Sequence, residues 1–208
     1  MSSNNTHDAS GQMAGYLYQV LAALSLLLDS RENDAQVCIE KFDDIAFVER
    51  DEPILMIQTK HQLYRPGSLT DTSVDLWRTV KSWCDSINNS PTHLHDTHFA
   101  ILTTSSAQER TAAYYLRKDA NRDTTEATRL LREAANSATV QTNERFYSAF
   151  LSLSPELQDN FIRHTYIYDN SQNISNLKTD IMRYIRWATL PQFEERVYNS
   201  VSAGGLML

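Results

Sequence analysis

Four side chains that carry oxygen or amine groups accompany three short strand-like runs near the N-terminus. Glu40 ends the run QVCIE, Asp44 precedes the run IAFVE, and Gln58 and Lys60 end the run ILMIQTK. Because side chains alternate along a strand, Gln58 and Lys60 point to the same face. A solvated strand end explains a glutamine and a lysine taken alone, so a functional interpretation requires a carboxylate beside them.

The segment RDEP at 50–53 predicts a turn, since Asp and Pro favour turns. This turn would make the flanking strands antiparallel and bring Gln58 and Lys60 near Asp44, within about one strand spacing, roughly 5 Å. Adjacent strand residues face opposite ways, so at most one of Asp43 and Asp44 joins the cluster. We predict that it is Asp44.

A carboxylate, an amide oxygen and an ammonium group together suit the hydrolysis of a phosphodiester. Mg²⁺ prefers oxygen ligands, which Asp44 and Gln58 carry, and Glu40 is a third candidate ligand. Such a metal polarises the phosphate and lowers the pKa of a bound water. Lys60 would hold the attacking water or stabilise the charge that develops on the phosphate. For Glu40, an exposed strand end is an equally good interpretation.

Helical and strand-like patterns surround these runs. Apolar spacing predicts a helix from about 12 to 28 that Ser10 caps, a helix over 74–87 and a buried strand over 97–103. From residue 108 the pattern is mostly helical, with a short alternating run at 165–169 that predicts an edge strand. The order is therefore α-β-β-β-α-β with a helical extension, which indicates an α/β fold.

This order, with an aspartate followed by Gln-x-Lys, resembles the PD-(D/E)XK nuclease superfamily in its glutamine variant. The chain is similar in particular to the double-stranded DNA endonuclease domain of bacterial anti-phage effectors. That domain is known from the CBASS effector that carries a SAVED sensor and from Lamassu-type systems. Five blocks in roughly the first half of the chain carry the resemblance: GYLYQ at 15–19, IEKFDDI at 39–45, IQTKHQ at 57–62, LTDTSVDLWRTVKSW at 69–83 and FAILTT at 99–104.

The resemblance implies a restriction-endonuclease-like fold and a metal-dependent endonuclease that degrades duplex DNA in anti-phage defence. It implies a nuclease core over residues 1–106 and a helical extension over 107–208 that completes the same domain. The implied cofactor is Mg²⁺ or Mn²⁺. The implied partners are duplex DNA and either further copies of the chain or defence-complex subunits, such as a sensor or an SMC-like ATPase.

By position, Asp44, Gln58 and Lys60 match the catalytic strand residues of that family. Glu40 and Gln19 match polar positions near the site, with Gln19 as an accessory residue on the first helix. The glutamine replaces an acidic ligand and removes a charge, so we expect a weaker metal site that forms together with DNA.

The chain has a net charge of −7, which disfavours tight DNA binding by an isolated copy. Basic residues nevertheless gather in one stretch and could contact phosphates. They are Lys60, His61, Arg65, Arg78 and Lys81. Oligomerisation would raise the local density of such sites and offset the acidic balance.

Two other interpretations stay open at this point. The chain could be a catalytically silent nuclease-like module that assembles a defence complex, although a silent module need not keep Asp44, Gln58 and Lys60. It could also be an RNA-cutting member of the same superfamily.

A cytoplasmic location without membrane contact is the expected one. The polar N-terminus lacks a basic segment before an apolar run, which argues against a secretory signal. The longest apolar candidate, Leu21 to Leu28, covers about two helical turns. Cys38 and Cys84 are predicted to be buried free thiols.

Overall fold

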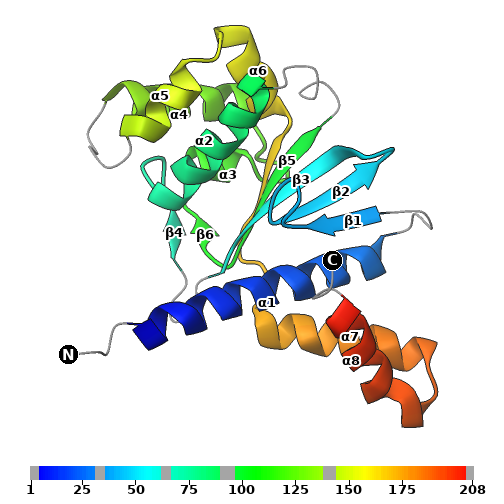
Figure 1. Cartoon of the computed structure of the whole chain (residues 1–208). Helices are drawn as coiled ribbons and strands as arrows, with labels where there is room; N and C mark the ends of the chain where they lie inside the picture. The colour runs from blue at the N-terminus through cyan, green and yellow to red at the C-terminus, as the bar shows by residue number, and fades with distance from the viewer. Residues whose placement is uncertain (1–4, 31–35, 62–66, 90–96, 138–143, 205–208) are drawn as a thin grey trace. The chain divides into compact units, whose positions relative to one another are not determined.

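The computed structural model describes residues 5–30, 36–61, 67–89, 97–137 and 144–204. The described residues form helices and strands in alternation, so the predicted α/β class is confirmed (Figure 1). The chain divides into two compact units, one of residues 1–63 with 172–208 and one of residues 64–171. The division implied by the resemblance, a nuclease core over residues 1–106 and a helical extension over residues 107–208, stays a prediction.

The first unit combines a long helix, an antiparallel meander and two further helices. Strands β1 and β2 pair antiparallel, as do β2 and β3. Helix α1 packs on β1 and β3 and also against α7 (Figure 1). The elements are α1 (Asn5–Asp29), β1 (Gln36–Ile39), β2 (Ile45–Glu49), β3 (Glu52–Lys60), α7 (Ile174–Ala188), the 3-10 helix η3 (Pro191–Phe193) and α8 (Glu194–Gly204).

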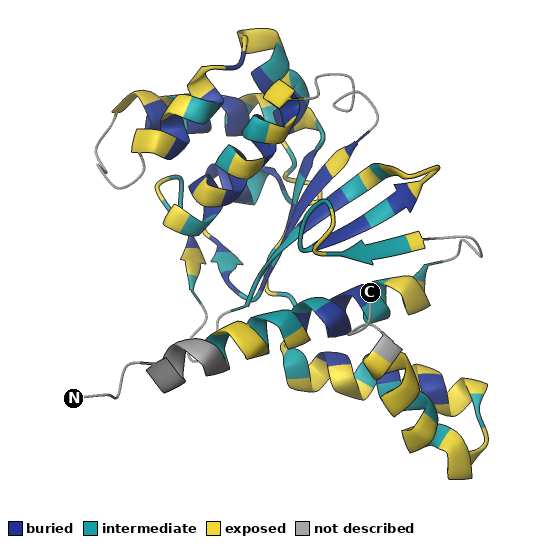
Figure 2. Ribbon diagram, viewed as in Figure 1, coloured by how far each residue is buried: buried dark blue, intermediate teal, exposed yellow. Residues whose placement is uncertain are grey.

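Helix α1 starts earlier than expected, so the prediction of Ser10 as its N-cap is wrong. The helix begins at Asn5, and the residues between Asn5 and Ser10 include no Pro or Gly that would interrupt it. Its middle part is buried, from Tyr18 to Ala23 with Gln19 only half-buried (Figure 2).

The apolar part of this helix extends beyond the predicted run Leu21 to Leu28. By length and composition alone, the stretch Gly11–Asp29 could cross a membrane, and the core helix of a soluble protein passes the same test. The cytoplasmic location stays a prediction. Both cysteines are free as predicted, but Cys38 is only half-buried, whereas Cys84 is buried.

A two-residue turn connects β2 to β3. Arg50 and Asp51 both have positive φ, at 52° and 66°, and Glu49 pairs with Glu52. Positive φ at both central residues is the signature of a type I′ hairpin turn, which matches the twist of the strands. The turn is therefore shorter than the predicted segment 50–53, and β3 begins at Glu52.

A β-bulge lies directly after this turn. Val48 pairs with Pro53, but the next pair is Phe47 with Leu55, so Ile54 is the extra residue on β3. Pro53 has no N–H to donate to a regular ladder, which suits an irregular position. Beyond the bulge the ladder continues with the register shifted by one residue.

The second unit contains two parallel strand pairs and five helices among its described residues. Strand β5 pairs with β7, as expected for the run at 165–169, and β4 pairs with β6. The elements are β4 (Ser68–Leu69), α2 (Val74–Asn89), β5 (His98–Thr103), β6 (Ser106–Ala107), α3 (Ala112–Tyr115), α4 (Thr124–Ser137), α5 (Glu144–Leu151), α6 (Pro155–Arg163) and β7 (Thr165–Tyr168).

Aromatic rings fill the core of this second unit. Trp77 on α2 is fully buried and meets Tyr147 edge-on, with ring centroids 4.6 Å apart. Trp83, one and a half turns further along α2, lies 5.1 Å from the ring of Phe99 on β5. Such contacts stabilise beyond the area they bury. Trp77 and Trp83 therefore belong to the core of this unit.

Candidate functional site

The carboxylate of Asp44 is bound by a single residue of β3. Asp44 lies just before β2, and its Oδ2 accepts hydrogen bonds from the backbone N–H of Thr59 at 2.7 Å and from the Thr59 hydroxyl at 2.8 Å. Thr59 stands between Gln58 and Lys60 in the chain. The structure therefore places the Asp44 carboxylate at the end of β3 that carries the other two candidate residues.

The register of the hairpin agrees with this contact. The ladder pairs Ile45 with Ile57 and ends there, which places Asp44 beside the residues that follow Ile57. Because side chains alternate along β3, the Thr59 side chain faces away from Gln58 and Lys60, and the Asp44 carboxylate contacts the strand end through Thr59. The predicted antiparallel return of the chain is confirmed, whereas catalytic roles for these residues stay predictions.

The bulge at Ile54 sets the register at this end of the hairpin. In the register of the turn, where Val48 pairs with Pro53, an uninterrupted ladder would set Asp43 across from Gln58 and Asp44 across from Ile57. The extra residue shifts the pairing by one. Asp43 instead accepts a hydrogen bond from the backbone N–H of Asp44, at 2.9 Å on its Oδ1.

Glu40 contributes through its backbone to the segment that connects β1 to β2. It has a left-handed φ of 59°, and its N–H donates to the carbonyl of Asp44 at 3.2 Å. Its side chain is exposed. Glu40 thus helps to hold Asp44 in place, while its predicted role as a metal ligand stays a prediction. Gln58 and Lys60 are both half-buried.

Three polar atoms near this end of β3 are buried without a hydrogen-bond partner among the described residues. They are the hydroxyl of Tyr18, Oε1 of Gln19 and Nδ1 of His61. The Tyr18 ring stacks on the imidazole of His61, which directly follows Lys60. Burial raises the pKa of Tyr18 to about 12 and lowers the pKa of His61. Buried polar groups without partners are uncommon in proteins, so each of these three atoms calls for a physical explanation.

Sequence reasoning did not single out Tyr18 or Thr59. Tyr18 lies in the block GYLYQ, directly before Gln19, but it does not fall on the apolar stripe predicted for that helix. The only sequence signal for Thr59 was its place between Gln58 and Lys60. A hydroxyl at that place can reach across to the neighbouring strand, which a spacing rule does not predict.

Two of the residues predicted to contact DNA form ion pairs with acidic residues of their own helix. On α2, Arg78 forms an ion pair with Asp75 at 3.9 Å, and Lys81 pairs with Asp85. An acidic residue about one turn away thus offsets each of these two charges. Arg65 lies outside the described residues. A role for any of them in DNA binding stays a prediction.

The donor atoms near Asp44 suit a hard cation. No group of three or more His, Cys, Asp or Glu side chains that could hold a metal ion occurs among the residues described. The candidate set does not depend on such a group, because it combines the Asp44 carboxylate with the Gln58 amide oxygen. Oxygen donors of this kind fit Mg²⁺ or Mn²⁺ better than soft metals.

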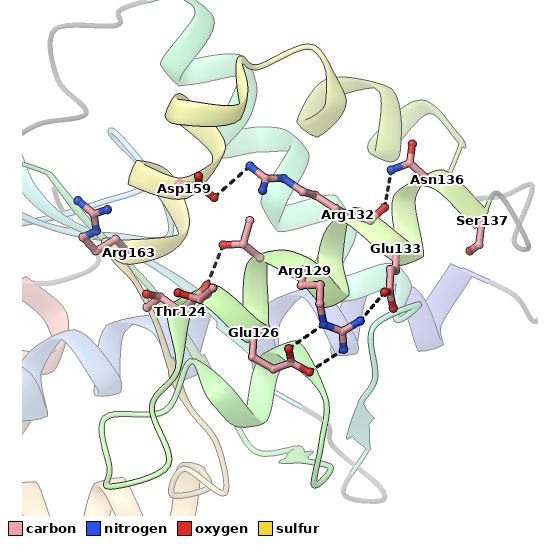
Figure 3. Close-up of a pocket in the computed structure, with 11 residues that line it drawn as sticks. Thr124, Glu126, Arg129, Arg132, Glu133, Asn136, Ser137, Asp159 and Arg163 are labelled. Carbon is pink, nitrogen blue, oxygen red and sulfur yellow. Dashed lines mark hydrogen bonds and ion pairs between the residues drawn. The ribbon is translucent and has the colours of Figure 1, made fainter.

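A separate pocket lies between α4 and α6 in the second unit (Figure 3). Two of its arginines are bonded to neighbouring acidic groups: Arg129 pairs with Glu126 and Glu133, and Arg132 pairs with Asp159 at 3.0 Å. None of the predicted site residues lines this pocket among those that the structure describes. The lining contains three arginines and three acidic side chains, so the pocket has no net charge that would attract a charged ligand.

Comparison of the sequence with models of known protein families found no match, and comparison with curated proteins found none either. The functional interpretation therefore rests on the residues of the chain, their geometry and the resemblance described above.

Proposed function

We propose that the chain is a metal-dependent endonuclease that hydrolyses phosphodiester bonds of double-stranded DNA in bacterial anti-phage defence. The proposal includes a restriction-endonuclease-like arrangement of the core. The observation that carries it is the Asp44 carboxylate, bound by Thr59 between Gln58 and Lys60. A carboxylate, an amide oxygen and an ammonium group at one strand end form a suitable set for phosphodiester hydrolysis.

In this proposal each residue has a separate role. Asp44 and Gln58 would hold Mg²⁺ or Mn²⁺, with Glu40 as a further candidate ligand. The cation, when bound, would polarise the phosphate and acidify a water molecule. Lys60 would hold the attacking water or stabilise the negative charge that develops on the phosphate. Gln19, with its buried Oε1, would accept a hydrogen bond at the edge of the site.

Binding to DNA would involve phosphate contacts from Lys60, His61, Arg65, Arg78 and Lys81. The net charge of −7 and the acidic partners of Arg78 and Lys81 weaken such contacts in one copy. We therefore propose that the active form is a homo-oligomer or a complex with defence subunits. A DNA affinity that stayed the same between monomer and assembly would argue against this part of the proposal.

Cleavage of plasmid DNA tests the activity and the site together. The wild type would be compared with Asp44→Ala and Lys60→Ala in Mg²⁺, Mn²⁺ or EDTA, at concentrations that favour assembly. Glu49→Ala is the matched control, because Glu49 is exposed at the opposite end of β2. We expect metal-dependent cleavage by the wild type and the control, and none by the two site variants. Cleavage that survives both substitutions would contradict the assignment.

A catalytically silent assembly module is the second candidate, and one observation favours it. Three large apolar side chains at the junction of α7 and η3 are exposed: Trp187 at 88%, Leu190 at 61% and Phe193 at 44%. Exposed apolar groups of this size are typical of interaction surfaces. An assembly that forms in light scattering but never cuts DNA or RNA would support this candidate. Competition between duplex DNA and RNA in the same assay would identify the preferred substrate.

A further inference from the structure

We propose that Tyr18 is a positioning residue, whose ring holds the imidazole of His61 and thereby fixes the end of β3 that carries Gln58 and Lys60. The inference deepens the proposed function and rests on it, because it concerns how the candidate lysine is held. It depends on contacts within the first unit.

The ladder between β2 and β3 ends before the candidate lysine. The last residue of β3 in that ladder is Ile57, whereas the strand continues to Lys60. Beyond the ladder, Thr59 donates two hydrogen bonds to the carboxylate that precedes β2, at 2.7 and 2.8 Å. His61, directly after the strand, stacks on the ring of Tyr18. Side-chain contacts thus hold the residue before Lys60 and the residue after it.

Tyr18 is a rigid anchor, because the part of α1 around it is buried. Its side chain is 0% exposed, and each of the residues 20–23 is 4% exposed or less. The close packing of a protein core confines such a ring. Its centroid lies 4.6 Å from that of the His61 imidazole, with the planes 30° from parallel, which is within the range of favourable offset stacking. The confined ring therefore restricts the imidazole and the backbone that carries it.

The anchor and the candidate lysine lie on opposite faces of the strand end. Side chains alternate along β3, so Gln58 and Lys60 share one face and Thr59 takes the other. His61 is the next residue of that second face, and its ring contacts α1. The stack therefore fixes the backbone of Lys60 from behind the face that carries the ammonium group.

The role proposed for Lys60 requires accurate placement. Catalytic groups have to be held within about 0.5 Å of the productive geometry, and a displacement of about 1 Å can cost roughly a hundredfold in rate. A strand end that moves would displace the lysine by such amounts. The ring of Tyr18 supplies the hold, since its hydroxyl has no hydrogen-bond partner among the described residues.

Three substitutions separate the ring from the hydroxyl and from general stability. Tyr18→Leu removes the stacked ring, whereas Tyr18→Phe keeps the ring and removes only the hydroxyl. Ile181→Ala is the matched control, because Ile181 is fully buried on α7 in the same unit and its truncation removes neither ring. His61→Leu breaks the same stack at a half-buried position and replaces Tyr18→Leu where that variant fails to fold. Circular dichroism and urea unfolding would establish that each variant is folded.

Two measurements would be made on each protein. Hydrogen–deuterium exchange would follow the Thr59 amide, which donates a hydrogen bond in the folded strand end. Steady-state cleavage of duplex DNA with Mg²⁺ would give kcat and KM.

We expect the Thr59 amide to exchange about tenfold faster in Tyr18→Leu than in the wild type, and at the wild-type rate in Tyr18→Phe. We expect kcat to fall at least about tenfold in Tyr18→Leu with KM unchanged, and Tyr18→Phe to restore it. Ile181→Ala should change both quantities less than about twofold, since a strand end exchanges by local opening rather than by global unfolding. Equal effects of Ile181→Ala and Tyr18→Leu would show a general loss of stability and overturn the inference.

The two measurements separate this inference from the proposed function. Unchanged exchange at Thr59 in Tyr18→Leu would overturn the inference whether or not the wild type cleaves DNA. Faster exchange together with no cleavage by the wild type would overturn the proposed function and confirm the hold on the strand end. An unchanged kcat in Tyr18→Leu, with or without a rise in KM, would overturn the positioning role in a protein that cleaves DNA.

Discussion

The ring of Tyr18 stacks on the imidazole of His61, with centroids 4.6 Å apart and planes 30° from parallel. This contact joins α1 to the residue that directly follows β3 and the candidate lysine, Lys60. Both rings carry a buried polar atom that has no partner among the described residues, the Tyr18 hydroxyl and Nδ1 of His61. Burial of these atoms leads to three predictions about stability.

Replacement of Tyr18 by Phe should stabilise the protein. It removes a buried hydroxyl and keeps the stacked ring, and an unpaired buried polar group costs roughly 1–3 kcal/mol. We expect the free energy of unfolding in urea to rise by about 1 kcal/mol at neutral pH. A fall of similar size would show that the hydroxyl forms a hydrogen bond that stabilises the folded state.

The same variant should change the response to alkaline pH. The pKa of Tyr18 is about 12 in the folded state, against an ordinary value of 10.0, because burial disfavours the phenolate. Between these two values the unfolded chain loses the proton first, so wild-type stability falls as the pH rises through this range. Tyr18→Phe should lack this part of the fall. Urea unfolding at increasing pH would measure the difference.

Replacement of His61 by Phe should reduce the sensitivity to acid. Burial lowers the pKa of His61 below its ordinary value of 6.5, so between the folded pKa and 6.5 the unfolded chain binds the proton more tightly. Wild-type stability contributed by the neutral imidazole is present above pH 6.5 and is lost as the pH falls toward the folded pKa. His61→Phe should show a shallower loss in urea unfolding. Tyr18→Phe, which keeps the histidine, should retain the acid response.

Loss of Arg122 should destabilise the second unit. Its guanidinium donates to the carbonyls of Leu116, Arg163 and Thr165 at 2.9 to 3.0 Å and lies 4.0 Å from the ring centroid of Tyr166. Arg122→Met would leave these carbonyls without their donor, and we expect a cost of about 2–3 kcal/mol in chemical denaturation.

The control for Arg122 is Lys118→Met, because Lys118 is exposed on the same unit. A surface substitution of this kind typically changes the free energy of unfolding by less than about 0.5 kcal/mol. Equal effects of the two substitutions would contradict the role given to the three carbonyl contacts.

A residue added to β3 next to Gln58 should affect plasmid cleavage, whereas a residue removed at the bulge should not. Deletion of Ile54 removes the extra residue of the bulge and leaves Ile57 paired with Ile45, so the register at Asp44 is kept. Insertion of one alanine between Ile57 and Gln58 turns Gln58 to the other face and moves it out of line with Asp44. If the proposed function holds, the deletion should retain plasmid cleavage and the insertion should abolish it. Circular dichroism of both variants would exclude loss of the fold as the cause.

Local patterns predicted many of the elements correctly. Helix α2 begins at Val74 as predicted, and β2 has the predicted bounds of 45–49. These features depend on residues within a few positions of one another. The helical pattern expected from residue 108 starts later in the structure, because Arg110 has a positive φ of 63° and Thr111 caps a helix that starts at Ala112.

From the sequence alone, the types of the candidate residues are determined, and so is the period of two that sets Gln58 and Lys60 on one face. The tertiary structure alone decides that the N–H and the hydroxyl of Thr59 hold the Asp44 carboxylate. The physical reason is that a strand register is a long-range property. A single extra residue at Ile54 moves every pair of the ladder beyond it, so the part of β3 that meets Asp44 depends on residues at the other end of the hairpin.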